Sequence, residues 1–286
     1  MSMIEPHTLE SIWDKLAPND FGEADLHTVQ INNTQFKKLY LPRGDEPSPV
    51  RIELGLSLYG LPRFAAYRYR LVLIPADVVG GLKRWKVREA DILSFIHWSK
   101  HMRHVITLST LKSGASFPLS VHAQSFPFES KNGELSALAE VGTEILVRRG
   151  MMPRFPSLEI GALRDYPLRG IRITGTDHEV ASKLFELALN YDHLKAFNLV
   201  IVPMPIKSFS PEFGAFFFPR RKDGRAIYDL NGNRWQIAAL EANGLMQTKS
   251  EKDLSQIDAA KICDIFERTG LNEAEFLEFL KLLETF

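Results

Sequence analysis

Residues 113–129 read SGASFPLSVHAQSFPFE, and the centre of this stretch decides how the chain is interpreted. Polar side chains alternate there with small apolar ones: Ser120, His122 and Gln124. In an extended strand, side chains two residues apart share one face, so Val121 and Ala123 point the other way, toward a core. The pattern predicts a half-buried strand that presents an imidazole and two further polar groups on a single face.

Charge balance and cysteine content exclude several classes of partner and site. The chain has 286 residues, of which 45% are apolar, enough for one large domain or two modest ones. Lys plus Arg and Asp plus Glu both number 35, so we expect neither a nucleic-acid nor a membrane partner. Cys263 is the single cysteine, which rules out an internal disulfide and a cysteine-based zinc site. These features, with a start that lacks a signal-peptide core, predict a soluble cytoplasmic protein.

The first half of the chain reads as strands interrupted by one helix. Residues 51–60 and 67–75 alternate and are rich in β-forming residues, so each is expected to form a strand. Residues 87–102 carry buried-type side chains at helical spacing: Ile92, Phe95, Ile96 and Ser99. Residues 104–112 and 113–129 are expected to supply two more strands.

The second half repeats this mixture of strands and helix. A strand is expected at 170–174, followed by a helix over 177–194 that carries an apolar stripe. Residues 197–204, 214–221 and 225–230 follow as strands. Asn272, with Glu275 three residues on, predicts a capped start for a C-terminal helix.

An irregular stretch, RRGMMPRFPSLEIG (148–161), separates the two sets of elements. We therefore divide the chain into residues 1–150, which carry the Ser-Val-His-Ala-Gln strand, and residues 151–286. Each part is expected to hold several mostly antiparallel strands with one or two covering helices. The predicted fold class is α+β, with two related halves around a shared sheet.

The order of several short motifs carries a resemblance to a known superfamily. Gly114-Ala115-Ser116 precedes the histidine strand, and further motifs follow downstream: LRDYPLRGIRITG (163–175), FNLVIVP (197–203), FFFPRR (216–221) and LEANGLM (240–246). The chain resembles the histidine-triad-like nucleotidyltransferase superfamily, in the branch of galactose-1-phosphate uridylyltransferase, diadenosine tetraphosphate phosphorylase and the GDP-hexose phosphorylases. The resemblance covers the chain from about residue 51 to its end and implies a HIT-like fold.

The central strand of that family reads His-x-His-x-Gln. His122 and Gln124 match its second histidine and its glutamine, whereas Ser120 stands where the family has the first histidine. The resemblance implies that His122 is a nucleophile, which attacks the α-phosphorus of a nucleotide and forms a phosphoramidate that an acceptor then opens. Histidine has an ordinary pKa of about 6.5 and is largely the free base near neutral pH, so we expect no metal and no cofactor.

The remaining site residues are assigned as supports of this chemistry. Gln124 would donate its amide N–H to a phosphate oxygen, and Ser120 would orient the imidazole or contact phosphate. Substrate phosphates require positive charge, for which the candidates are Arg63, on an early strand, and two residues at a strand end, a natural pocket rim: Arg220 and Arg221. The resemblance alone adds two substrate-binding residues: Asn198 and Glu241.

Several alternatives remain open from the residues. The expected substrate is a nucleotide sugar or a dinucleoside polyphosphate, with inorganic phosphate or a sugar phosphate as the acceptor. Ser120 in place of a histidine favours a second class, a nucleotide-binding protein that kept the fold and lost turnover. A phosphoanhydride hydrolase is the third hypothesis. The superfamily often pairs two such units, so either a homodimer or the two halves of this chain would supply the pair.

A group of three histidines lies near the predicted helix: His97, His101 and His104. The first two have the i, i+4 spacing that metal pairs use, but no third ligand follows at a diagnostic spacing. We therefore expect helix-surface histidines and no metal site.

Overall fold

The computed structural model describes residues 3–17, 24–40, 48, 50–63, 67–80, 84, 86–110, 121–130, 133–192, 196–204, 211–221, 227–228, 234–235, 237–248 and 250–284. Its helices are α1 (Pro6–Leu16), α2 (Ala76–Val79), α3 (Glu89–Met102), α4 (Asp177–Asp192), α5 (Ala239–Ala242), α6 (Glu251–Gln256), α7 (Ala259–Thr269) and α8 (Glu273–Glu284). Its strands are β1 (His27–Ile31), β2 (Thr34–Tyr40), β3 (Ile52–Gly55), β4 (Leu58–Pro62), β5 (Leu71–Pro75), β6 (His104–Ser109), β7 (Ala123–Pro127), β8 (Glu129–Ser130), β9 (Gly133–Glu134), β10 (Thr143–Val147), β11 (Glu159–Leu163), β12 (Ile171–Thr174), β13 (Ala196–Pro203), β14 (Phe213–Arg220), β15 (Ile227–Tyr228), β16 (Arg234–Trp235) and β17 (Leu245–Thr248).

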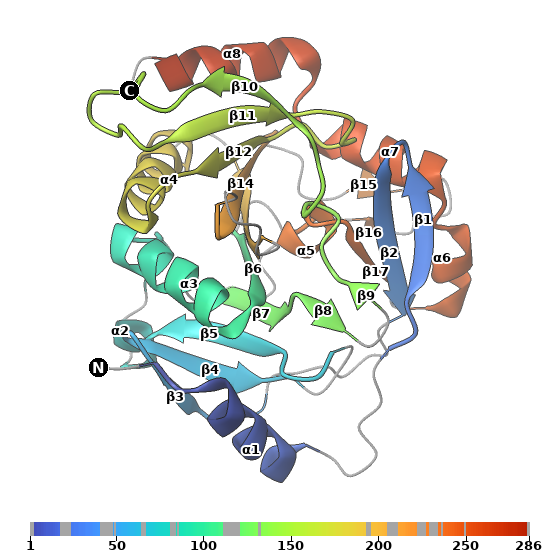
Figure 1. Cartoon of the computed structure of the whole chain (residues 1–286). Helices are drawn as coiled ribbons and strands as arrows, with labels where there is room; N and C mark the ends of the chain where they lie inside the picture. The colour runs from blue at the N-terminus through green and yellow to red at the C-terminus, as the bar shows by residue number, and fades with distance from the viewer. Residues whose placement is uncertain are drawn as a thin grey trace.

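A ten-stranded sheet in the order β10-β11-β12-β14-β13-β6-β7-β5-β4-β3 runs through the molecule (Figure 1). Every neighbouring pair in it is antiparallel. β6 lies near its centre and pairs on one side with β13 and on the other with β7. Strands from both predicted parts of the chain therefore form one sheet, as the α+β expectation with a shared sheet requires. The boundary at residue 150 stays a prediction.

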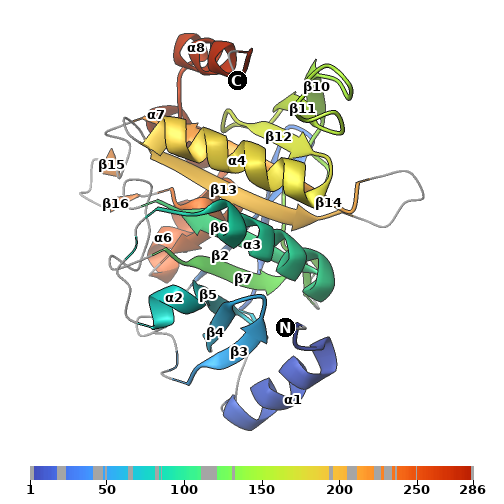
Figure 2. The same ribbon diagram turned by 90° about the vertical axis from the view of Figure 1, so that its left-hand side faces the viewer.

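The large sheet has a different cover on each face. Helices α3 and α4 lie side by side across one face, as Figure 2 shows. A small sheet, β1-β2-β17, and helices α5 to α7 cover the other. Successive side chains of β6 point to opposite faces of the sheet. Ile106 and Leu108 lie in the core under α3 and α4, and Val105 lies in the core on the other face. We call these the helical face and the mixed face.

The helix predicted over 87–102 is confirmed as α3, and the apolar side chains of its predicted stripe are fully buried. Its hydrophobic spacing is that of a helix packed on a sheet, so the pattern was decisive. The predicted cap of the last helix is also confirmed, since the Asn272 and Glu275 side chains each accept the other's backbone N–H, at 2.8 and 2.9 Å. In the described residues, no helix is long and apolar enough to cross a membrane.

The single strand expected over 51–60 is wrong, because this segment is a hairpin of β3 and β4. Three successive residues at the reversal have positive φ: Gly55 at 84°, Leu56 at 50° and Ser57 at 58°. A leucine rarely adopts this left-handed conformation, so Leu56 hides a reversal that only the flanking Gly55 and Ser57 mark in the sequence.

The strand expected around the histidine is shorter than predicted. β7 begins at Ala123, so His122 immediately precedes it. Val121 and Ala123 are both buried in the core of the helical face, as the alternation predicted. Ser120 and the Gly-Ala-Ser turn lie outside the described residues.

Candidate functional site

A row of polar side chains lies on the mixed face, across four neighbouring strands. Its members are Gln124 on β7, Ser109 on β6, Asn198 on β13 and Arg220 on β14. Alternate residues of each strand belong to opposite cores, which assigns all four side chains to the same side. The register supports this, since Asn198 is directly opposite Ser109, and Gln124 opposite Thr107, two residues earlier on β6. Neighbouring strands are about 4.8 Å apart, so the four side chains are neighbours on one face, with Gln124 diagonal to Ser109.

Arg220 and Asn198 form the buried end of this row. Both side chains have no exposed surface, and Arg220 Nη1 donates to Asn198 Oδ1 at 2.8 Å. The same guanidinium donates to two backbone carbonyls, from Nε to Thr269 O at 3.0 Å and from Nη1 to Ile237 O at 3.1 Å. The expectation that Arg220 lies on a pocket rim is therefore wrong. A buried guanidinium must satisfy its N–H groups within the protein, and here three acceptors from separate segments do so.

Ser109 connects the row to the element that covers it. Asn198 Nδ2 donates to Ser109 Oγ at 3.2 Å, and the backbone N–H of Ala239 donates to the same oxygen at 2.8 Å. Ala239 is the first residue of α5, so this hydroxyl fixes the start of that short helix above the sheet. Ser109 was not selected from the sequence, because a serine near a strand end gives no signal of its partners.

The orientation of Gln124 is set by Arg70, which is almost completely buried. Arg70 Nη2 donates to Gln124 Oε1 at 2.9 Å. Because a guanidinium can only donate, this contact identifies the oxygen of the amide and directs the NH₂ group elsewhere. An amide NH₂ held in this way is suited to donate to an anionic oxygen, which is the role the motif implied for Gln124.

Glu241, on α5, brings an acidic group close to both arginines. Its Oε2 accepts the backbone N–H of Ala238 at 2.8 Å. Burial of the carboxyl raises the pKa of Glu241 to about 7, against the opposing effects of that hydrogen bond and of the positive charges of Arg220 and Arg70. Glu241 therefore titrates near neutral pH within a group of two buried cations.

We predict a pH dependence of stability from this carboxyl. The native state holds a proton on Glu241 that the unfolded chain has already lost, so the free energy of unfolding falls as pH rises from about 4.5 to about 7. The slope contributed is at most about 1.4 kcal/mol per pH unit. Glu241→Gln keeps a neutral side chain of the same size, and urea unfolding between pH 5 and 8 should show that this slope has gone. Glu278→Gln, at an exposed position of α8, is the control; an unchanged slope in Glu241→Gln contradicts the assignment.

His122 is held through its neighbour in the chain. Its side chain is 7% exposed, and Val121 N donates to the carbonyl oxygen of Arg84 at 2.7 Å. The positions of Val121 and Ala123 in the helical-face core direct the His122 side chain toward the mixed face, the side of Gln124. The segment that carries the candidate nucleophile is therefore positioned by Arg84.

Arg84 is itself fixed by two carboxylates. Its guanidinium binds Asp91 at 2.5 and 3.0 Å and Asp77 at 3.1 and 3.2 Å, so it joins α2 to the start of α3. The Arg84 hydrogen bond lowers the pKa of the Asp77 carboxyl. Nothing in the sequence identified this arginine, because its partners are seven residues away on either side.

We predict that Arg84→Met destabilises the protein by about 2–4 kcal/mol, since it leaves the nearly buried Asp91 carboxylate without its cation, whereas Asp77 keeps Arg88 at 2.7 Å. The matched control is Arg268→Met, which removes an exposed i, i+4 pair with Asp264 and should cost less than about 0.5 kcal/mol. Urea unfolding at neutral pH measures both. Equal effects in the two variants would show that the Arg84 contacts add nothing beyond a surface pair.

Two other predicted site residues, Arg221 and Arg63, have contacts outside the polar row. Arg221 Nε binds Glu275 of α8 at 3.0 Å, with both side chains about one-third exposed (32% and 35%). Arg63 follows β4, where its N–H donates to the carbonyl oxygen of Arg70. Among the described residues, no group of three or more His, Cys, Asp or Glu side chains could hold a metal ion.

No family model and no curated protein sequence matches this chain. Solved structures do match it: yeast Ap4A phosphorylase Apa2 gives a TM-score of 0.65 at 9% identity, covering 94% of this chain and 96% of that one. The same enzyme in complex with Ap4A gives 0.63 at 12% identity, covering 94% and 99%. A galT-like protein from Arabidopsis thaliana gives 0.40 at 10% identity, covering 87% and 100%. The likeness to the yeast enzyme shows a shared fold and confirms the HIT-like α+β architecture that the motifs predicted.

Proposed function

We propose that this protein is a cytoplasmic phosphorylase or nucleotidyltransferase that acts on a dinucleoside polyphosphate or a nucleotide sugar through a nucleotidyl-His122 intermediate. One observation carries the proposal. Residues that the motifs named in three distant segments, Gln124, Asn198 and Arg220, lie in one continuous row on one face of the sheet, with Glu241 above it. His122 immediately precedes the strand at one end of that row.

The proposed reaction has two displacements at the α-phosphorus. In the first, a ring nitrogen of neutral His122 forms a bond to phosphorus, and the bond to the bridging oxygen breaks, releasing a nucleoside triphosphate or a sugar 1-phosphate. In the second, an oxygen of inorganic phosphate or of a sugar phosphate attacks phosphorus, and the N–P bond breaks. With inorganic phosphate the product is a nucleoside diphosphate, and the imidazole returns to its starting state.

The described residues supply specific help for these steps. Gln124, oriented by Arg70, donates its NH₂ group to a phosphate oxygen as negative charge develops there. The buried guanidinium groups of Arg70 and Arg220 make the electrostatic potential of the site positive while they stay hydrogen-bonded to their own acceptors. Arg220 thus acts through the field and through the placement of Asn198, in place of the direct phosphate-tail contact first expected. Arg221 and Arg63 remain predicted phosphate contacts.

A second function, nucleotide binding without turnover, is favoured by one observation. Ser120 stands at the position of the first histidine of the motif, and a serine orients an imidazole less strongly than a histidine does. In that case the polar row would hold a nucleotide, and His122 would have no chemical role. A hydrolase is the third candidate, in which water replaces phosphate as the acceptor.

Product analysis separates the three functions. The protein is incubated with diadenosine tetraphosphate, GDP-sugars and UDP-sugars, each with and without inorganic phosphate, and the nucleotides are resolved by chromatography. Nucleoside diphosphate formed only with phosphate is the expected result. Nucleoside monophosphate formed without phosphate would identify a hydrolase. A rise in melting temperature with no product from any substrate would identify a binding protein and overturn the proposal.

A further inference from the structure

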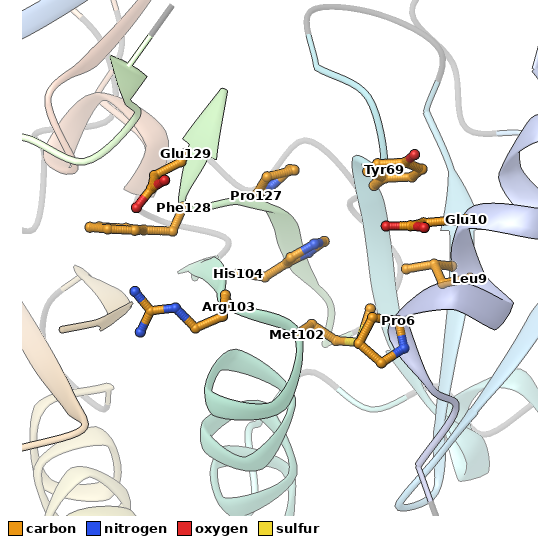
Figure 3. Close-up of a pocket in the computed structure, with 10 residues that line it drawn as sticks. All are labelled: Pro6, Leu9, Glu10, Tyr69, Met102, Arg103, His104, Pro127, Phe128 and Glu129. Atoms are coloured by element: carbon orange, nitrogen blue, oxygen red, sulfur yellow. The ribbon is translucent and has the colours of Figure 1, made fainter. Parts of the chain in front are cut away.

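A pocket lies on the helical face of the sheet, where β6 begins and β7 ends, at the far end of these strands from His122. It has a volume of about 290 Å³ and is enclosed by α1, the end of α3, the start of β6 and the end of β7 (Figure 3). His104, on its floor, is directly opposite Pro127, five residues beyond His122 along the same segment. At about 3.4 Å per residue this separates the pocket from His122 by about 17 Å, with the sheet between them.

His104 was expected to be a helix-surface histidine, and this is wrong. It begins β6 and is 4% exposed, because the helix ends at Met102 and the chain turns back into the sheet. Its Nδ1 is 2.8 Å from Ser125 Oγ, which also receives the indole N–H of Trp98 at 2.9 Å. An edge contact with the Trp98 ring, at 6.2 Å between centroids, holds the imidazole plane.

Ser125 Oγ takes part in both contacts. The indole N–H can only donate, so Ser125 Oγ accepts it, and the Ser125 hydroxyl proton is available for donation to His104 Nδ1. When Ser125 donates to Nδ1, the proton of a neutral His104 is on Nε2, and the ring lines the pocket. Burial lowers the pKa of His104 to about 3, so the imidazole stays neutral at physiological pH. The floor of the pocket is a fixed, uncharged N–H donor.

The opposite wall provides an acceptor. Glu10 reaches from α1 toward His104, between Tyr69 and Leu9 (Figure 3). Tyr69 supplies an aromatic ring, and further apolar surface comes from the surrounding walls: Leu9, Met102 and Pro127. A donor and an acceptor facing each other across a pocket with aromatic and apolar side walls are suited to a flat polar ring.

The charges around the pocket disfavour a phosphorylated ligand. Arg103 is its only lining cation among the described residues, and it is already engaged, with Nη1 donating to Met204 O at 2.9 Å and its guanidinium over the Phe128 ring. Glu10 and Glu129 both line the pocket. Burial, followed by the charges of Glu140 and Glu129, raises the pKa of nearby Glu134, while the charge of Arg103 opposes this shift.

We propose that this pocket binds an aminated heteroaromatic ring, such as an aminopurine or aminopyrimidine base or its nucleoside, without phosphate groups. The ligand presents an amidine edge, N=C–NH₂, with its amino group donating to Glu10 and its ring nitrogen accepting from His104 Nε2. The ring lies against Tyr69 and the apolar wall. The site is independent of the polar row and does not require the proposed function.

The test compares adenine with purine, which has the same ring system without the amino group. Protein with ¹⁵N- and ¹³C-labelled histidine is titrated with each, and the His104 signal is assigned by its absence from the spectrum of His104→Gln. Adenine is expected to shift the His104 signal with at least fivefold higher affinity than purine. Glu10→Gln should weaken adenine binding at least fivefold and leave purine binding unchanged.

Two controls locate the effect. Asp264→Asn removes an exposed carboxylate of α7 and should leave adenine binding unchanged, and Glu278→Gln, at an exposed position of α8, should do the same. The proposal is overturned if adenine leaves the His104 signal unmoved, if purine shifts it with equal affinity, or if its proton is found on Nδ1. Because the readout is binding at His104, its failure leaves the phosphorylase assay unaffected, and the converse also holds.

Discussion

His122→Ala is expected to lower product formation from the active substrate by at least about 10³-fold, the scale seen when a covalent nucleophile is removed. An alanine cannot form the phosphoramidate, and no other described histidine lies on the polar row. His122 directly precedes β7, and the substitution removes only its imidazole ring. The melting temperature should therefore fall by only a few degrees. Initial rates and thermal unfolding of the same preparation measure both effects.

The matched control for this variant is His178→Ala, at an exposed position of α4, which should retain full activity. A second readout separates chemistry from structure: in His122→Gly, added imidazole should occupy the space left by the side chain and restore part of the rate. Full activity in His122→Ala would remove the histidine from the mechanism. A loss of activity that tracks a loss of folded protein would give the residue a structural role only.

Arg220→Met is expected to cost about 3–5 kcal/mol of folding free energy, because it removes a fully buried, hydrogen-bonded charge and leaves its partners unsatisfied. Three acceptors lose their donor: Asn198 Oδ1, Thr269 O and Ile237 O. For a chain of this size the melting temperature should fall by roughly 10 °C. Denaturant unfolding and thermal scans both measure the effect.

The next residue in the chain is a close control. Arg221→Met removes one partly exposed contact with Glu275, at 3.0 Å, and should cost less than about 1 kcal/mol. Similar losses in the two variants would contradict the burial argument. If Arg220→Met instead abolished activity at unchanged stability, Arg220 would be a direct phosphate contact, as the sequence first suggested.

Local periodicity predicted those elements whose side chains alternate between two well-defined environments. The spacing of Ile92, Phe95 and Ile96 predicted α3, and all three are fully buried. The alternation of Val121 and Ala123 predicted which side of the chain faces the core. In both cases the pattern reflects burial of apolar surface, which a single sequence records directly.

Contacts between distant segments could not be predicted in the same way. Arg220 at a strand end has the pattern of a solvated rim residue, and its burial depends on acceptors from distant segments, among them Asn198 Oδ1 and the carbonyl oxygens of Thr269 and Ile237. Ser109 and Arg84 were missed for the same reason, since their roles depend on partners that the sequence does not pair with them. The motif order brought Asn198 and Glu241 to attention, but it did not show that Asn198 contacts Ser109 and Arg220 on the neighbouring strands, or that Glu241 accepts the N–H of Ala238.

Mass spectrometry of the intact protein tests the central claim most directly. The protein is mixed briefly with diadenosine tetraphosphate or a nucleotide sugar in the absence of phosphate, quenched at alkaline pH where a phosphoramidate survives, and weighed. The account predicts a mass increase of one nucleoside monophosphate, mapped to the peptide that contains His122, lost on addition of phosphate and absent from His122→Ala. Turnover without this adduct, or an adduct on a different residue, would contradict it.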